Sequence, residues 1–224
     1  NLTRLISPRD FVEGHVLDVK ALLESKLLDF PAMDLGSGAG VPGLLAAIVR
    51  PDPWVLAESE RHKAEFLFRI ARELNLTSVK VVADRGESYL VDHEVHTVVA
   101  RAVGTVEKIY GWLRERSTWN NLVLMKSTGW EAEWKTFQET KWGRELQIER
   151  TTEYRVGAEQ KYRIIVRLER VPRGTSLMTL SERFFCQSIK FESDVPVSAS
   201  LLPAEKGELA VLAESSSHGP LRAR

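Results

Sequence analysis

A glycine-rich turn is the part of this sequence whose residue types and spacing point most directly to chemistry. Residues 33–43 read MDLGSGAGVPG and join an apolar run at residues 30–35 to a second apolar segment at residues 44–49. This pattern predicts a strand, a tight turn and the start of a helix. A turn through Gly36, Gly38, Gly40 and Gly43 has more glycines than a simple turn needs, and glycine allows the backbone to approach a bound ligand closely. We therefore expect the backbone of this turn to form a ligand site.

Two acidic residues near the turn bear on the kind of nucleotide-like ligand, and one of them discriminates. Residues 38–43 also match G-x-G-x-x-G, a dinucleotide pattern that is weak by itself. Asp34 would repel a pyrophosphate at the helix start, whereas it would attract the ammonium and sulfonium of S-adenosylmethionine. Glu58 follows the apolar run at residues 54–57, where a second strand places a carboxylate that accepts from ribose hydroxyls. Both ligands contain ribose, so Asp34 decides for S-adenosylmethionine; the alternative for Glu58 is a surface acid.

Alternating helix and strand patterns along residues 7–125 must position these groups. Ser7, Pro8 and Asp10 form a capping signal for a first helix. Its expected apolar face consists of Phe11, Val12, Val16, Val19, Leu22 and Leu23. Further strands are expected at residues 79–83, 95–100 and 122–125, the first two of them buried, and further helices at residues 59–74, 105–116 and 131–142.

A hairpin closes the predicted sheet. Residues 147–155 and 161–168 have strand character, and Gly157 lies near the turn between them. Together with the alternating units, this predicts an α/β fold: a Rossmann-like, doubly wound, mostly parallel sheet closed by an antiparallel hairpin. Ligands of such sheets bind beyond the carboxyl ends of the strands.

Composition restricts the class of protein. The 224 residues allow one α/β domain plus extra segments, and the formal net charge of zero means that nucleic acid would have to bind a local basic patch. Cys186 is the single cysteine, which excludes an intrachain disulfide. No apolar run reaches the length of a membrane span and no signal peptide opens the chain, so we expect a cytoplasmic protein without membrane contact and without a metal site.

A series of short motifs gives a more specific indication. It comprises residues 1–3 (NLT), 15–18 (HVLD), 33–43, Glu58 with Lys63, 85–87, 100–102, and Met125 with Lys126. This series resembles the bacterial 16S ribosomal RNA guanine-N7 methyltransferase family, also called glucose-inhibited division protein B, over residues 1 to about 170. The resemblance implies a class I methyltransferase fold, S-adenosylmethionine as methyl donor, and a guanosine N7 in 16S ribosomal RNA or the small-subunit particle as acceptor. By motif, it implies cofactor contacts at Gly36, Val41, Glu58, Gly86, Glu87 and Arg101.

The chemistry of that reaction sets roles for the basic residues. Guanine N7 exposes a lone pair, so methyl transfer needs alignment of N7, methyl and sulfur but no general base. We expect Arg101 and Lys126 to orient a phosphate, O6 or the cofactor carboxylate, and His15 to contact RNA. The alternatives are a strand-end ion pair for Arg101, a solvated lysine for Lys126, and for His15 a bond to Asp18 or to a backbone carbonyl.

The predicted organisation is a methyltransferase domain at residues 1–170 and an appended, poorly ordered tail at residues 171–224, with a short amphipathic helix at residues 177–185. We expect a monomer. Two other functions stay open: a methyltransferase with a different acceptor, because fold and cofactor do not fix the acceptor, and a non-catalytic RNA-binding relative.

Overall fold

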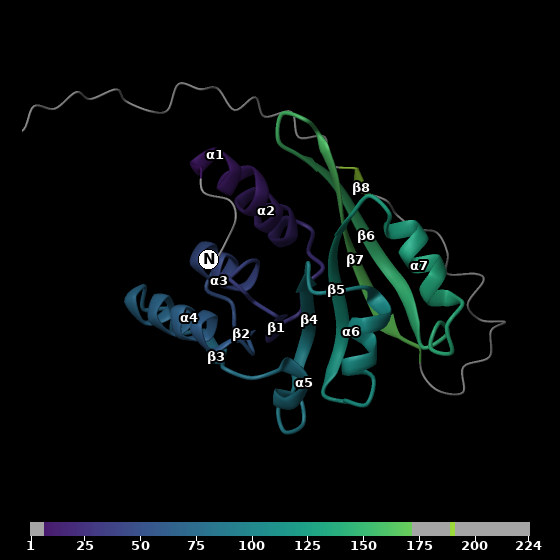
Figure 1. Ribbon diagram of the computed structural model, residues 1–224, viewed down its shortest axis with the longest axis horizontal. Helices are drawn as coiled ribbons and strands as arrows, with labels where there is room; N and C mark the ends of the chain where they lie inside the picture. The colour runs from purple at the N-terminus through teal and green to yellow at the C-terminus, as the bar shows by residue number, and fades with distance from the viewer. Residues whose placement is uncertain (1–6, 172–188, 191–224) are drawn as a thin grey trace, which may run out of the picture. The chain divides into compact units, whose positions relative to one another are not determined.

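One mixed sheet organises the described part of the chain. The computed structural model describes residues 7–171 and 189–190, which belong to the first of two compact units, residues 1–193 and 194–224. The strands lie in the order β3-β2-β1-β4-β5-β7-β6-β8 (Figure 1). Their bounds are β1 Ala32–Leu35, β2 Trp54–Ala57, β3 Val79–Val82, β4 Val95–Arg101, β5 Trp119–Ser127, β6 Leu146–Val156, β7 Lys161–Arg170 and β8 Ile189–Lys190.

The strand pairing confirms the predicted α/β class. Strands β3, β2, β1, β4 and β5 are mutually parallel, and β7 is antiparallel to both β5 and β6. The hairpin therefore adds its second strand, β7, directly to β5, and β6 lies one strand further out. The short β8 pairs in parallel with β6 at Thr152 and Glu153.

Helices cover both faces of the sheet, as a doubly wound fold requires. One apolar cluster joins the sheet to α2 (Leu17–Glu24), α3 (Gly43–Val49) and α4 (Arg61–Glu73) through residues such as Leu22, Leu44 and Leu67. The other joins the opposite face to α6 (Val106–Leu113) and α7 (Trp130–Gln138). The short α5 (Gly86–Tyr89) follows β3.

The first helical segment is less regular than the sequence predicts. Ser7 caps α1 (Pro8–Phe11) by accepting from the Asp10 amide, as expected, but a π-helical turn, η1 (Val12–Val16), follows before α2 begins. This turn changes the phase of the helix, so Phe11 and Val12 are 39% and 44% exposed whereas Val19 and Leu22 are buried. The prediction of one continuous apolar face was therefore wrong.

Two further expectations are corrected. Strand β3, expected to be buried, forms an edge of the sheet, and its residues are half-buried or exposed. Helix α7 ends at Gln138, short of the expected residue 142. The expected helix at residues 177–185 and Cys186 lie outside the described residues.

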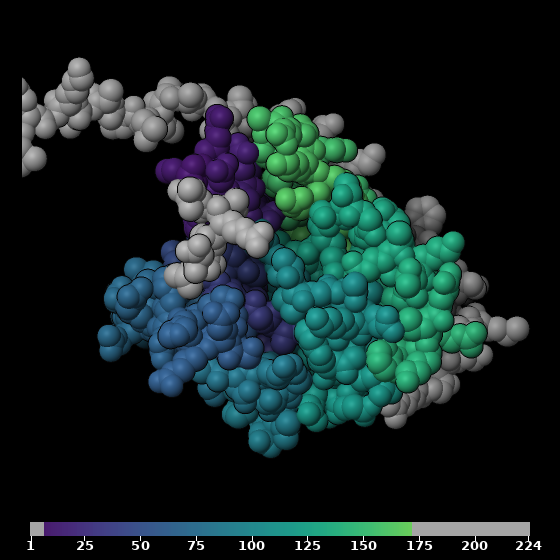
Figure 2. Space-filling model, viewed as in Figure 1, coloured from purple at the N-terminus to yellow at the C-terminus, as the bar shows by residue number. Residues whose placement is uncertain are grey.

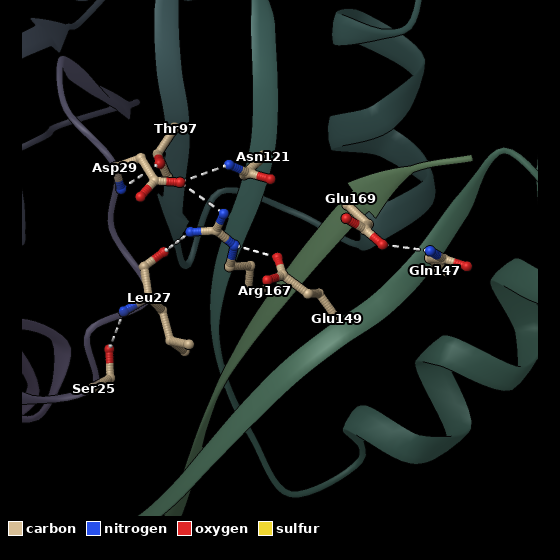
Figure 3. Close-up of polar contacts among 9 residues, drawn as sticks. All are labelled: Ser25, Leu27, Asp29, Thr97, Asn121, Gln147, Glu149, Arg167 and Glu169. Atoms are coloured by element: carbon tan, nitrogen blue, oxygen red, sulfur yellow. Dashed lines mark hydrogen bonds and ion pairs between the residues drawn. The ribbon is translucent and has the colours of Figure 1, made fainter. Parts of the chain in front are cut away.

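The connection between α2 and β1 is fastened to the sheet by Arg167 of β7 (Figure 3). Its guanidinium donates to the Leu27 carbonyl at 2.9 Å, to Asp29 at 2.7 Å and to Glu149. Asn121 of β5 also donates to Asp29, at 3.1 Å. These contacts fix the segment that leads into β1, and with it the strand that carries the glycine turn.

Candidate functional site

The glycine turn lies where the sheet order reverses direction. Strand β1 has β2 on one side and β4 on the other, and crevices at such points bind ligands in open α/β sheets. Gly36, Gly38 and Gly40 have backbone φ values of +72°, +56° and +91°, which residues other than glycine rarely adopt. Both Gly36 and Ser37 donate their amides to Ala57 of β2. The glycines thus meet a backbone requirement that the sequence pattern indicated.

Asp34 braces the turn from inside the protein. Its carboxylate accepts from the Gly43 amide at 2.8 Å, and a Cβ on Gly43 would lie 2.7 Å from the Asp34 Cβ. Asp34 is 1% exposed, and this burial raises its pKa to about 7. Its other oxygen, Oδ1, is buried without a hydrogen-bond partner. Asp34 therefore joins β1 to the start of α3, and its attraction for a cationic cofactor stays a prediction.

Glu58 is held at the rim of the turn by two backbone amides. One carboxylate oxygen accepts from Gly38 and the other from Glu60, both at 2.8 Å, and the residue is 8% exposed. Glu58 is therefore not an ordinary surface acid. Each of its oxygens keeps a second lone pair, so the amide contacts leave capacity for ribose hydroxyls.

Gly86 lets the start of α5, after β3, pack closely against β1, the strand before the glycine turn. A Cβ there would lie 2.4 Å from Cδ1 of Leu35 and 3.0 Å from the sulfur of Met33, so a side chain would push α5 away from β1. Glu87 follows in the first turn of α5, with Arg85 at 3.4 Å from its carboxylate. Val41, in the glycine turn, packs half-buried against the cluster beneath α3. Their predicted cofactor contacts stay predictions.

Arg101 forms the ion pair that was the alternative to a ligand-orienting role. At the end of β4, its guanidinium donates to Asp18 of α2 at 2.9 and 3.1 Å and to the Gly14 carbonyl. Asp18 is 2% exposed and also accepts from the Tyr154 hydroxyl at 2.8 Å. Arg163 approaches the same carboxylate at 3.8 Å. Arg101 therefore anchors α2 to the sheet beside the glycine turn.

His15 lies next to this ion pair and bonds a backbone carbonyl. Its Nδ1 is 2.8 Å from the Gly14 carbonyl oxygen, and its ring meets Phe11 edge to face. Burial lowers the pKa of His15, and the charge of Arg101 lowers it further. The imidazole is therefore mainly neutral at pH 7.

Lys126 is paired rather than solvated. At the end of β5, its ammonium donates to the Gly104 carbonyl and to Glu133 of α7, each at 2.8 Å, and its side chain is 13% exposed. Glu133 also accepts from the Val106 amide, at 2.6 Å. Lys126 thus ties the loop after β4 to α7.

Sequence reasoning placed Arg101, Lys126 and the glycine turn at one edge of the sheet, but it missed their partners. Asp18 was considered only as a neighbour of His15, although it is the acid that organises the edge. Tyr154, Arg163 and Glu133 carry no local signal, because their role depends on contacts across many residues of chain.

Comparison with known proteins decides the family. A family model described as GidB, rRNA small subunit methyltransferase G, matches residues 1–161. The chain belongs to the GidB family. Among relatives named ribosomal RNA small subunit methyltransferase G, that of Nitrosococcus oceani is 41% identical over 46% of this chain and 48% of its own length. That of Rhodopirellula baltica is 39% identical over 58% and 57%. This GidB-family chain thus spans about half the length of the curated relatives that it matches.

Solved structures confirm the class I methyltransferase fold of the GidB-family chain. M. capricolum TrmK, in complex with S-adenosyl-homocysteine, superposes with a TM-score of 0.52 over 72% of this chain and 73% of its own, at 10% identity. The delta-N METTL16 MTase domain has a TM-score of 0.51 over 69% and 82%, at 12% identity. None of the helices that the structure describes is long and apolar enough to cross a membrane. Among the same residues no group of three or more His, Cys, Asp or Glu is arranged to hold a metal ion.

Proposed function

We propose that this chain transfers a methyl group from S-adenosylmethionine to N7 of a guanosine in 16S ribosomal RNA. The observation that carries the proposal is the GidB family match over residues 1–161, which includes the glycine turn and the edge occupied by Arg101 and Lys126. The described fold supports it, since the glycine turn, Glu58, Arg101 and Lys126 lie at or just after the carboxyl ends of parallel strands.

The residues around the turn fit the cofactor. Positive-φ glycines open a backbone cradle, Glu58 presents two pre-oriented carboxylate oxygens, and Asp34 carries a buried oxygen without a partner. We assign cofactor contacts to Gly36, Gly38, Gly40, Val41, Glu58, Gly86 and Glu87. When bound, S-adenosylmethionine supplies an electrophilic methyl group on a sulfonium.

The polar groups beside the turn suit an acceptor that needs no base. A purine gains positive charge when its N7 is methylated, so an unpaired cation next to N7 would oppose the reaction. The pair with Asp18 offsets the charge of Arg101, and a mainly neutral His15 adds little positive charge. We therefore assign Arg101 and Lys126 to shaping and orienting the acceptor site, and His15 to contact with RNA.

The proposal extends to the oligomeric state, the cellular compartment and the RNA substrate. We infer that the chain acts as a monomer in the cytoplasm on 16S ribosomal RNA or the small-subunit particle. The family match supports a ribosomal RNA substrate. Since the formal net charge is zero, RNA must be recognised by a local arrangement of charge rather than by the whole surface.

The test is methyl transfer with isotopically labelled S-adenosylmethionine. Unmethylated 16S transcript and small-subunit particles serve as acceptors, and the labelled nucleotide is mapped by chemical cleavage at N7-methylguanosine. The expected result is label at a single guanosine with the wild-type chain and no label with Gly38→Val. Gly38 has a left-handed backbone conformation, with φ of +56°, that valine rarely adopts, so this substitution should distort the turn. Label on another acceptor, or cofactor binding without transfer, would replace this proposal by one of the two other functions.

A further inference from the structure

Positive charge exceeds negative charge at one cluster on the carboxyl edge of the sheet. Arg101 and Arg163 both face the single carboxylate of Asp18, Arg101 at 2.9 Å and Arg163 at 3.8 Å. The third partner of Asp18 is the Tyr154 hydroxyl, and burial, followed by the nearby carboxylate, raises the pKa of that hydroxyl, so Tyr154 stays neutral. The cluster therefore holds two cations and one anion.

Strand register explains why these side chains meet. Arg163 lies opposite Tyr154 in the β6–β7 ladder and opposite Ser127 at the end of β5. Side chains two apart on a strand share a face, so Arg163 points to the same face as Ile165, which is buried in the cluster beneath α2. This places Arg163 under the start of α2, at the edge where the parallel strands end.

Two neighbouring ion pairs leave this excess unchanged. Arg9 is paired with Glu13, 3.8 Å away, and Lys161 is paired with Glu159, 3.0 Å away. The first helical segment and the tip of the hairpin lie next to each other (Figure 2), with Glu13 close to Gly157. Since both pairs are balanced, neither offsets the extra positive charge of the Asp18 cluster.

Arg163 is the member of the cluster with capacity for a ligand. Its side chain is 28% exposed, compared with 20% for Arg101, and its contact with Asp18 is long, whereas Arg101 makes two close bonds to the same carboxylate. Besides this contact, Arg163 donates to the Tyr162 carbonyl at 3.2 Å. A guanidinium has five N–H donors and matches a phosphate in a two-pronged geometry.

The strand that carries Arg163 is not a neighbour of the strand that carries the glycine turn. Strands β4 and β5 lie between β1 and β7, and strand spacing of about 4.8 Å puts β7 roughly 14 Å from the glycine turn. Arg163 therefore lies on a strand further from the turn than Arg101 of β4, and we expect a polynucleotide whose base enters beside β4 to reach it.

We propose that Arg163 binds a phosphate of the RNA substrate next to the target nucleotide. This inference rests on the proposed function and names a substrate contact for the same site. The pair of Arg101 and Asp18 holds α2 in place, while Arg163 supplies the uncompensated charge for a phosphodiester. The net charge of zero makes such a local contact necessary.

The test compares three variants of the full chain in binding to a 16S ribosomal RNA transcript over a series of salt concentrations. Arg163→Gln removes the charge, Arg163→Lys keeps it, and Arg150→Gln removes an exposed charge from the same hairpin, further from the edge. Loss of one phosphate contact lowers the slope of log affinity against log salt by roughly 0.7, or about fivefold in affinity at about 0.1 M salt. We expect this change for Arg163→Gln only, with unaltered melting temperature and cofactor affinity.

Methylation separates binding from chemistry. Arg163→Gln should raise the RNA concentration needed for half-maximal rate and leave the rate at saturating RNA unchanged, and Arg163→Lys should restore most of the affinity, since lysine binds phosphate as a point charge. An unchanged salt slope for Arg163→Gln, in a chain that still methylates RNA, would overturn this inference and leave the proposed function standing. A wild-type chain that neither binds nor methylates RNA would overturn both.

Discussion

At the carboxyl edge of the sheet, the polar residues that could meet a ligand are held by protein partners. Glu58 accepts from two amides, Arg101 is bound to Asp18, and Lys126 is bound to Glu133. Such contacts fix the direction of each side chain before a ligand arrives, so binding costs less reorganisation. They also mean that changing one residue disturbs its partner, and variants must be chosen with the partner in view.

Glu58 offers the most direct test of the cofactor site. Glu58→Gln replaces one oxygen by an NH2 group, which must then face an amide donor of Gly38 or Glu60 and cannot accept from a ribose hydroxyl. We expect affinity for S-adenosylmethionine to fall roughly tenfold or more, about 1.4 kcal/mol, measured by calorimetry. Glu60→Gln is the matched control, because that side chain is exposed and paired with Lys63. Equal affinities for the two variants would remove Glu58 from the cofactor site.

Asp34 should make stability depend on pH. Its pKa is about 7 in the folded protein against an ordinary value of 3.8, so the folded state retains a proton that the unfolded state releases between these values. The contribution of Asp34 to stability is therefore complete below pH 4 and is lost as the pH rises to about 7. Asp34→Asn stays neutral and can still accept from the Gly43 amide.

The free energy of unfolding of Asp34→Asn, relative to wild type, should therefore increase with pH between about 4 and 7, by up to about 1.4 kcal/mol per pH unit, and level off above. Urea titrations at several pH values measure it. Asp92→Asn, at an exposed position, is the control and should show no such trend. A difference that does not vary with pH would contradict the assigned burial effect.

At the scale of elements, β7 approaches the α2 segment at both ends and fastens it at the second end. Arg163 and Arg167 lie four residues apart on one face of β7; Arg163 reaches Asp18 near the start of α2, and Arg167 reaches Leu27 and Asp29 after its end (Figure 3). The last strand pair of the fold therefore positions the segment that leads into β1.

Arg167→Ala tests this attachment. Removing the guanidinium takes a donor from the Leu27 carbonyl, from Glu149 and from Asp29, which keeps only Asn121, and since the Arg167 side chain is only 13% exposed, we expect a loss of about 2 kcal/mol in the free energy of unfolding. Arg150→Ala, at an exposed site opposite Arg167 in the hairpin, should change stability by less than about 0.5 kcal/mol. Urea denaturation compares them; equal effects would show that Arg167 contributes no more than a surface arginine.

Local patterns predicted the elements well, because strands and helices here follow their apolar periodicity. The run at residues 54–57 became β2, Ser7 caps the first helix as expected, and a helix begins after Thr105 within the expected range. The π-helical turn at Val12–Val16 was not predictable from periodicity, because it changes the helical phase without any proline or glycine at its start. The position of β7 beside β5 depends on long-range pairing, which no local pattern encodes.

At the scale of the whole molecule, the sequence predicted which of these residues lie at one edge of the sheet but not which partners hold them. Carboxyl ends of parallel strands meet at one edge, so the glycine turn, Glu58, Arg101 and Lys126 could be placed together from their strand ends alone. Their partners could not, since Asp18 and Arg101 are 83 residues apart in sequence and Tyr154 is 136 residues from Asp18. Contacts over such separations are fixed by packing of the complete fold.

The described fold should not depend on the segment after β7. As far as the structure describes the chain, the residues of its two apolar clusters precede Val171, and the amide of Val171 donates to the Glu145 carbonyl at 3.0 Å. Beyond that point, the described attachment to the sheet is the two-residue pairing of β8 with β6, worth on the order of 1 kcal/mol.

A chain ending at Val171 should therefore melt no more than roughly 2–4 °C below the full chain and bind S-adenosylmethionine with equal affinity. Differential scanning calorimetry and titration calorimetry measure the two quantities on both chains. A much larger drop in melting temperature with unchanged cofactor affinity would show that the later segment stabilises the β6 edge, and loss of affinity as well would show that it contributes to the site.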